Sequence, residues 1–469
     1  MKVLLLERHD DPSVSGGWVA HVGSANERPG ITGIAHLFEH MMFKGTPTIG
    51  TKDAAKDLEI IAEQERVRDV MREEEAKMRA AYRRGELEDL TKPESKSERY
   101  RELEKEFNQL IQAQRDIQVK NEFDRIYRSA GGAGMNAFTM QDMTGYFINV
   151  PANKIELWMW MESERLLNPV FREFYAERDV VYEERRMRTE STPLGKFAET
   201  FNAMFFDAHP YHWPVIGWPS DVASISKAEA DAFYNTFYAP QNITLILVGD
   251  FNSAKLLPQL ERYFGRIPRG PNNAPDLVTQ EIPQVAEKRM NAEAEANPQV
   301  QIQWHTVPFA HRDSYALDIL GELLSGRTGR LYKGLVLGSE VATEANAGQM
   351  SLKWAGWFAA EGEAREGHTP EEVEQAIYAE LEKLKSEAVP PEELQKVKNN
   401  FAAAEYRKLS SNQAILMQLI FNEGLGDWRE FNTAAAQHQA VTADDVRRVA
   451  SQYLTRENRA VATYTRKAN

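Results

Sequence analysis

Apolar residues along this chain alternate and cluster in patterns that predict both strands and helices. The run Val3–Leu6 and the segment Trp18–Val22, which follows two glycines, are typical of strands. A further strand is predicted over 144–150, and a helix rich in Trp and Met is predicted over about 154–167. At helical spacing these large side chains indicate a packed core rather than cofactor contacts.

Residues from about 55 to 120 differ, because they are highly charged and follow a heptad pattern. The pattern occupies positions 60, 64, 67, 71, 74, 78 and 81, then 100, 103, 107, 110, 114 and 117. A turn near Thr91–Glu94 separates the two runs, so we predict a projecting antiparallel helical hairpin with arms of roughly 40 Å. The hairpin could be a docking arm or a gate, or it could be a solvated spacer. The polar residues Gln64, Glu74 and Gln114 weaken the seam, which favours the spacer.

Two distant segments, 226–250 and 442–466, resemble each other. Each begins as a capped helix and ends as a strand. Ser226 and Glu229 have the spacing of a capping box, and Thr442 and Asp445 are a close analogue. The period of about 215 residues indicates a duplicated domain rather than a solenoid. We therefore predict domains at 1–265 and 277–469, joined by a linker at 266–276 that is rich in Pro, Gly and Asn.

Length, charge and cysteine content narrow the class of protein. A chain of 469 residues is too long for one core, and no apolar run reaches the ~20 residues of a membrane helix. The formal charge of −14 argues against nucleic acid as a partner. Because cysteine is absent, any metal must be held by His, Asp or Glu. The start lacks a signal-peptide pattern, so we expect a periplasmic protein whose leader was removed, if the source is bacterial, or a cytoplasmic protein.

The strongest candidate for chemistry is the pentapeptide His-Leu-Phe-Glu-His. On a helix, His36 and His40 lie one turn apart and can bind one metal ion, with Glu39 on the same side. The order His-x-x-Glu-His is the inverzincin pattern of zinc peptidases. Thr32-Gly33 marks the start of this helix, and Lys44-Gly45 marks its end. The alternative is a solvated helix with incidental histidines.

A second charged helix is predicted around residues 177–186. Glu177 and Glu184 are seven residues apart and therefore share a helix face. One of them could bind a metal while the other supports the site from behind. Composition by itself favours an ordinary surface helix of alternating charge.

Together these segments resemble the pitrilysin-type peptidases, family M16, over nearly the whole chain. The likeness rests on the motif with the following Met-Met-Phe-Lys-Gly-Thr at 41–46, the glycine-rich stretch ending in Asn-Ala-Phe-Thr at 136–139, and the segment 177–184, in the family's order. It implies that His36, His40 and Glu184 bind one zinc ion per chain. It also implies that Glu39 activates water and that Glu177 is a supporting catalytic carboxylate.

The spacing departs from the family pattern. His40 and Glu184 lie 144 residues apart, about twice the usual distance, and the helical hairpin accounts for the excess as an insertion. Glu183 is a rival for the third ligand. We prefer Glu184 because of its spacing to Glu177.

The resemblance also implies an α+β fold of two homologous domains, each a mostly antiparallel sheet covered by helices on one side. Only the first half has the zinc motif, so the second is an inactive copy. Substrate is expected to add as a strand along Asn136 and Ala137, with Arg330 contacting it from the second half. The expected activity is that of a zinc-dependent endopeptidase acting on peptides or unfolded polypeptides in an enclosed chamber.

Short family members, such as mitochondrial processing peptidase and its bacterial relatives, need two facing chains to close that chamber. Where a substrate-contacting tyrosine is expected after Arg330, this chain has Val341–Thr343. We therefore expect the zinc-bearing subunit of a heterodimer with a homologous subunit; a homodimer is the alternative. The alternative function is a zinc-bearing peptide-binding or scaffold subunit with little activity of its own.

Overall fold

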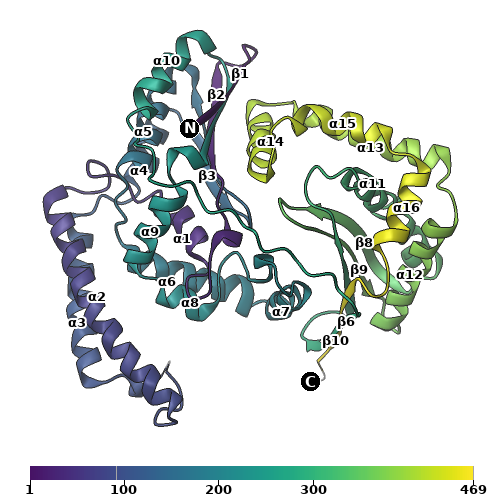
Figure 1. The fold of residues 1–469 in the computed structure, drawn as a ribbon, viewed down its shortest axis with the longest axis horizontal. Helices are drawn as coiled ribbons and strands as arrows, with labels where there is room; N and C mark the ends of the chain where they lie inside the picture. Colours follow the sequence, from purple (N-terminus) through teal and green to yellow (C-terminus); the bar gives the residue numbers. More distant parts are fainter. Residues whose placement is uncertain (91, 468–469) are drawn as a thin grey trace.

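The computed structural model describes residues 1–90 and 92–467, which form two bodies, each built on a five-stranded sheet (Figure 1). The first sheet has the order β1-β5-β2-β4-β3 and the second β6-β10-β7-β9-β8. The strands of the first are β1 Lys2–Glu7, β2 Ser13–Ala20, β3 Ala133–Thr139, β4 Thr144–Pro151 and β5 Ile243–Gly249. Those of the second are β6 Lys288–Ala294, β7 Gln299–Thr306, β8 Ala342–Ser351, β9 Gly356–Ala364 and β10 Arg459–Arg466.

The two sheets correspond strand for strand. In each, the first two neighbours are parallel and the remaining pairs are antiparallel. The predicted repeat is helix α9 (Lys227–Phe237) followed by β5 and helix α16 (Ala443–Tyr453) followed by β10, and both predicted capping boxes are present. The α+β fold with two homologous halves is confirmed.

Helices make up most of the rest of both halves. The first half contains α1 Ile34–Met41, α2 Ala54–Arg83, α3 Glu98–Ile117, α4 Glu122–Ser129, α5 Ile155–Leu167, α6 Phe174–Arg185, α7 Gly195–Phe205, α8 Pro219–Ser224, α9 Lys227–Phe237 and α10 Ser253–Phe264. The second contains α11 Ser314–Leu324, α12 Pro370–Ser386, α13 Pro391–Lys408, α14 Asn412–Leu425, α15 Glu430–Ala440 and α16 Ala443–Tyr453. A π-helical turn, Arg186–Glu190, directly continues α6.

One helix of each half packs against the sheet of the other half. Alternate residues of a strand face opposite sides of its sheet, so Trp18 enters the main core of the first half whereas Val19 faces Leu416 of α14. In the same way α7 packs Phe205 beside Ala462 on the second sheet. The expectation of helices on one side therefore describes each half alone. In the whole molecule the second face is covered by a helix from the other half.

The hairpin is present, with unequal arms. The arms α2 and α3 pack together and project from the first half (Figure 1). Their 30 and 20 residues correspond to about 45 and 30 Å, so the prediction of equal 40 Å arms was wrong. The predicted seam is buried nearest the domain, at Ile60, Val67, Leu103 and Phe107. Thr91, in the predicted turn, lies outside the described residues.

Two of the polar seam residues, Gln64 and Gln114, form hydrogen bonds inside the hairpin. Gln64 Nε2 donates to Gln114 Oε1 at 3.2 Å, and Gln114 Nε2 donates to Asp57 Oδ1 at 2.9 Å. The expectation that these glutamines weaken the seam overlooked this pairing, because a buried amide is costly only when it lacks a partner.

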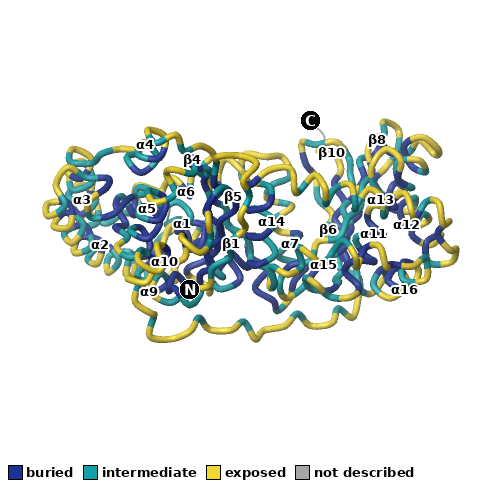
Figure 2. Tube along the Cα trace, turned by 90° about the horizontal axis from the view of Figure 1, so that it is seen from above, coloured by how far each residue is buried: buried dark blue, intermediate teal, exposed yellow. Residues whose placement is uncertain are grey.

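The predicted linker at 266–276 lies within a longer segment, 265–287, that has no helix or strand. Figure 2 shows this segment as a largely exposed path between the two bodies. Across residues 1–90 and 92–467, no helix is both long enough and apolar enough to cross a membrane.

Candidate metal centre

The first core orients the motif helix α1. Leu37, Phe38 and Met41 are almost fully buried, and the Phe38 ring lies 5.2 Å from those of both Phe171 and Tyr238. Because these apolar positions are fixed in the core, helical geometry turns His36 and His40 toward α6.

A buried carboxylate holds the start of α1. Glu27 accepts hydrogen bonds from the backbone N–H groups of Gly33 and Ala35, at 2.9 and 2.8 Å. Gly33 adopts φ +91°, which favours glycine. Burial raises the pKa of Glu27 well above its usual value, and the two backbone bonds oppose that rise. The predicted start at Thr32-Gly33 is confirmed, but the α-helix ends at Met41, before the predicted Lys44-Gly45, because 42–45 form tighter turns.

Two imidazoles and one carboxylate converge between α1 and α6. Glu184 Oε2 lies 3.4 Å from His40 Nε2 and 3.9 Å from His36 Nε2. One donor atom from each of the three residues lies within 4.8 Å of the others, and no other such group of three or more occurs among the described residues. Two imidazole nitrogens and a carboxylate oxygen are a donor set that zinc takes in catalytic sites. Glu183 instead pairs with Arg186 on the exposed face.

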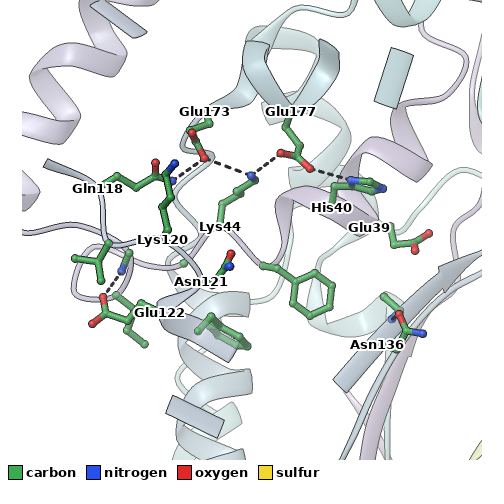
Figure 3. Close-up of a pocket in the computed structure, with 17 residues that line it drawn as sticks. Glu39, His40, Lys44, Gln118, Lys120, Asn121, Glu122, Asn136, Glu173 and Glu177 are labelled. Atoms are coloured by element: carbon green, nitrogen blue, oxygen red, sulfur yellow. Dashed lines mark hydrogen bonds and ion pairs between the residues drawn. The ribbon is translucent and has the colours of Figure 1, made fainter. Parts of the chain in front are cut away.

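A chain of ion pairs supports His40 from behind. Glu177 Oε1 lies 2.9 Å from His40 Nδ1, and Glu177 Oε2 lies 2.5 Å from Lys44 Nζ (Figure 3). Burial raises the pKa of Glu177, but the His40 and Lys44 partners outweigh it and lower the value to about 2. Burial lowers the pKa of His40, yet the carboxylates around it raise it overall. Burial, helped by the His40 charge, lowers the pKa of His36 to about 3.

The other oxygen of Glu184 is also occupied. Arg188 Nη1 lies 2.9 Å from Glu184 Oε1 and comes from the π-helical turn that follows α6. This leaves Oε2 as the atom that faces both histidines. Carboxylates that bind metals are usually held by such a partner on the free oxygen.

Glu39 lies beside this group and is tied to the sheet. Thr139 Oγ1 donates to Glu39 Oε2 at 2.8 Å. Burial raises the pKa of Glu39 above its usual value, opposed by the Thr139 hydrogen bond. Glu39 and His40 line a cavity of about 480 Å³ together with Asn136 and Ala137 of β3 (Figure 3). Strand β3 ends the sheet order, and within residues 1–90 and 92–467 it pairs with β4 alone, so its other edge has no strand partner there.

The structure does not bring Arg330 to this group. Its guanidinium binds Glu393 in the second half with two hydrogen bonds, of 3.0 and 2.7 Å. Val341–Thr343, at the start of β8, supplies no tyrosine.

Sequence reasoning missed several supporting residues. Lys44 and Arg188 each lie four residues after a candidate ligand, and that spacing could have indicated them. Glu27 precedes Gly33 by only six residues, and no motif considered in the sequence included it. Thr139 is 100 residues from Glu39 and meets α1 only through the folded chain, so no local pattern marks that contact.

The chain is similar to several proteins that are named as zinc proteases. It is 30% identical over 346 residues to a protein named Zinc protease PqqE of Helicobacter pylori, covering 71% of this chain and 76% of that protein. This chain belongs to peptidase family M16. Two family profiles match it, "Insulinase (Peptidase family M16)" over 2–66 and "Peptidase M16 inactive domain" over 224–401.

Other M16 relatives match along most of the chain. A protein named uncharacterized zinc protease YmxG of Bacillus subtilis is 21% identical over 446 residues, covering 94% of this chain and 90% of that protein. The crystal structure of a protease from Helicobacter pylori has the same fold, with a TM-score of 0.79, 23% identity, and coverage of 98% and 96% of the two chains. The match to the insulinase profile, over 2–66, covers His36–His40, and the match to the inactive-domain profile, over 224–401, covers Arg330.

Proposed function

We propose that this M16 protein is a zinc-dependent endopeptidase. The observation that carries the proposal is the convergence of His36, His40 and Glu184 beside Glu39. The three donor groups suit zinc. The Glu39 carboxylate lies beside them but is not one of them. The alternative function is a zinc-bearing peptide-binding or scaffold subunit. It would use the same three donor residues but would not require Glu39 as a general base.

In this proposal His36, His40 and Glu184 hold zinc. When bound, zinc lowers the pKa of a water and polarises the scissile carbonyl. Glu39 accepts the proton of the attacking water and then delivers it to the leaving amine nitrogen. Thr139 orients the Glu39 carboxylate, and Glu177 fixes the His40 ring by accepting a hydrogen bond from its Nδ1–H group.

Substrate is proposed to add as a strand along the free edge of β3, at Asn136 and Ala137, which line the same cavity as Glu39 and His40. Backbone hydrogen bonds of this kind hold a peptide largely independently of its sequence. An enclosed chamber would then admit unfolded polypeptides and exclude folded ones.

We propose that a homologous M16 subunit completes the chamber, with a homodimer as the alternative. Two observations support a second chain: Arg330 is already paired with Glu393, and a relative over 154 residues at 25% identity is named mitochondrial-processing peptidase subunit beta, of Caenorhabditis elegans. Light scattering and peptidase assays of this chain alone are the test. Full activity from a homodimer would refute the heterodimer.

The periplasmic expectation also remains a proposal. A structure titled as the periplasmic protease PqqL of Escherichia coli shares the fold, with a TM-score of 0.69. Fractionation of the native source would test it, and recovery in the cytoplasm would refute it.

The central test combines metal analysis with a quenched-peptide library. We expect one zinc per chain and cleavage that stops on chelation and returns with zinc. Zinc with no cleavage of any peptide, alone or with a homologous subunit, would instead support the peptide-binding alternative.

A further inference from the structure

A chain of side chains joins the base of the hairpin to a candidate zinc ligand. Gln118, which directly follows α3, donates from Nε2 to Glu173 Oε2 at 2.6 Å. Lys44 Nζ lies 3.4 Å from Glu173 and 2.5 Å from Glu177, which in turn binds His40 (Figure 3). The exposed fractions of the Lys44, Glu173 and Glu177 side chains are 20%, 15% and 13%, so solvent screens these pairs only partly.

A second, fully buried connection runs through Arg172. Its guanidinium pairs with Asp57 of α2, both side chains being 1% exposed, and Asp57 accepts from Gln114 of α3. Arg172 also donates to the carbonyl oxygens of Thr46 and Ile49, at 2.6 and 2.8 Å, in the loop that follows α1. A buried ion pair persists only when its other donors are satisfied. Here the loop after the motif helix accepts from Arg172, and the two hairpin helices supply Asp57 and the Gln114 amide that donates to it.

The hairpin also packs on α6, which carries Glu177 and Glu184. The Tyr175 ring lies 5.3 Å from that of Phe107 in α3 and beneath the Arg68 guanidinium of α2. Tyr175 is 3% exposed and precedes Glu177 by two residues.

The segment that leaves the hairpin forms one wall of the cavity at Glu39 and His40. Residues 118–123 line it, and Figure 3 shows Gln118, Lys120, Asn121 and Glu122 on the side away from Asn136. In contrast, the outer hairpin, which comprises residues 75–96, contributes none of its described residues to this cavity.

We propose that the base of the hairpin is a working part of the metal centre, with Gln118 as a positioning residue that acts on His40 through Glu173, Lys44 and Glu177, whereas the outer hairpin is dispensable for the site. This inference rests on the proposed zinc site. Without the Gln118 donor, Glu173 draws Lys44 toward itself, and Glu177 holds His40 less firmly.

The test is the zinc affinity of the full chain, measured by chelator competition, for Gln118→Leu and for Gln112→Leu. Gln112 is a matched control because it lies six residues away, in the last turns of α3, and its side chain binds only Asp116 among the described residues. We expect Q118L to weaken zinc binding roughly tenfold, the lower end for an outer partner, with an unchanged melting temperature of the metal-free protein. Q112L should match the wild type.

A third variant replaces residues 78–95 with a four-residue turn of Gly and Asn. On the domain side of the replaced segment, Ser97 Oγ donates to Glu74 Oε2 at 3.0 Å and so already joins the two arms. It should retain wild-type zinc affinity. Equal affinity of Q118L and Q112L, or a loss caused by the outer truncation, would overturn the inference and leave the proposed zinc site standing. A wild-type chain that binds no zinc would instead refute the proposed function itself.

Discussion

Thr139 Oγ1 donates a 2.8 Å hydrogen bond to Glu39 Oε2 and so joins the edge strand β3 to the motif helix α1. The contact links the strand proposed to bind substrate with the group proposed to move its proton. It spans 100 residues of sequence, and it fixes which way the Glu39 carboxylate points.

Replacing Glu39 with Gln should abolish hydrolysis and spare zinc. The amide keeps the size of the side chain but cannot accept the proton of water, and general-base catalysis typically contributes at least about 100-fold. Zinc content and turnover of a quenched peptide are the two measurements. Normal turnover by E39Q would eliminate this mechanism.

Thr139→Val should lower kcat roughly tenfold, because it removes one hydrogen bond to a charged group, worth about 1.5 kcal/mol, from the catalytic carboxylate. Thr139→Ser keeps the hydroxyl and is the control, which should retain most activity. Steady-state kinetics of both variants test this. Equal kcat for the two would show that the hydrogen bond has no part in catalysis.

Glu184→Gln should weaken zinc binding by more than about 100-fold, since even outer partners of a metal ligand typically change affinity 10–100-fold. Glu183→Gln is the neighbouring control, and it should bind zinc normally because Glu183 pairs with Arg186 at the surface. Chelator competition distinguishes them. The reverse ranking would assign the third ligand to Glu183.

Arg188→Ala should lower zinc affinity roughly tenfold, because the free oxygen of Glu184 loses its partner. Arg186→Ala removes a similar arginine two residues away, one that binds Glu183, and should have no effect. Arg188→Lys should restore part of the loss. Identical zinc titrations for R188A and R186A would contradict this role.

Stability should fall in mild acid. Burial lowers the pKa of His209 and of His305 to about 4, from an ordinary 6.5. Between these values the unfolded chain binds more protons, so the free energy of unfolding decreases as pH falls from about 6.5 to about 4. The double variant His209→Gln, His305→Gln should lose less melting temperature than the wild type between pH 7 and pH 5. Equal losses would show that these two histidines do not cause the effect.

Local periodicity explains what could be predicted about the site. His36, Glu39 and His40 share one side of a helix because positions three and four apart always do. The hairpin seam followed from the same rule, and the repeat of a capped helix and a strand indicated the duplication. The choice of Glu184 over Glu183 was only a preference based on spacing, and the side chains that meet His36 and His40 depend on how α6 packs against α1.

The sequence by itself determined the motif helix, the helical hairpin, the repeated pair of a capped helix and a strand, and the candidate donor residues of α1, because each depends on residues close together in the chain. Only the tertiary structure decided that Thr139 meets Glu39, that α7 and α14 cover each other's sheets, and that Gln118 reaches the support of His40. These contacts depend on the packing of segments up to hundreds of residues apart. Such packing depends on the shape and burial of whole surfaces, and the spacing of residues within a short segment does not reveal it.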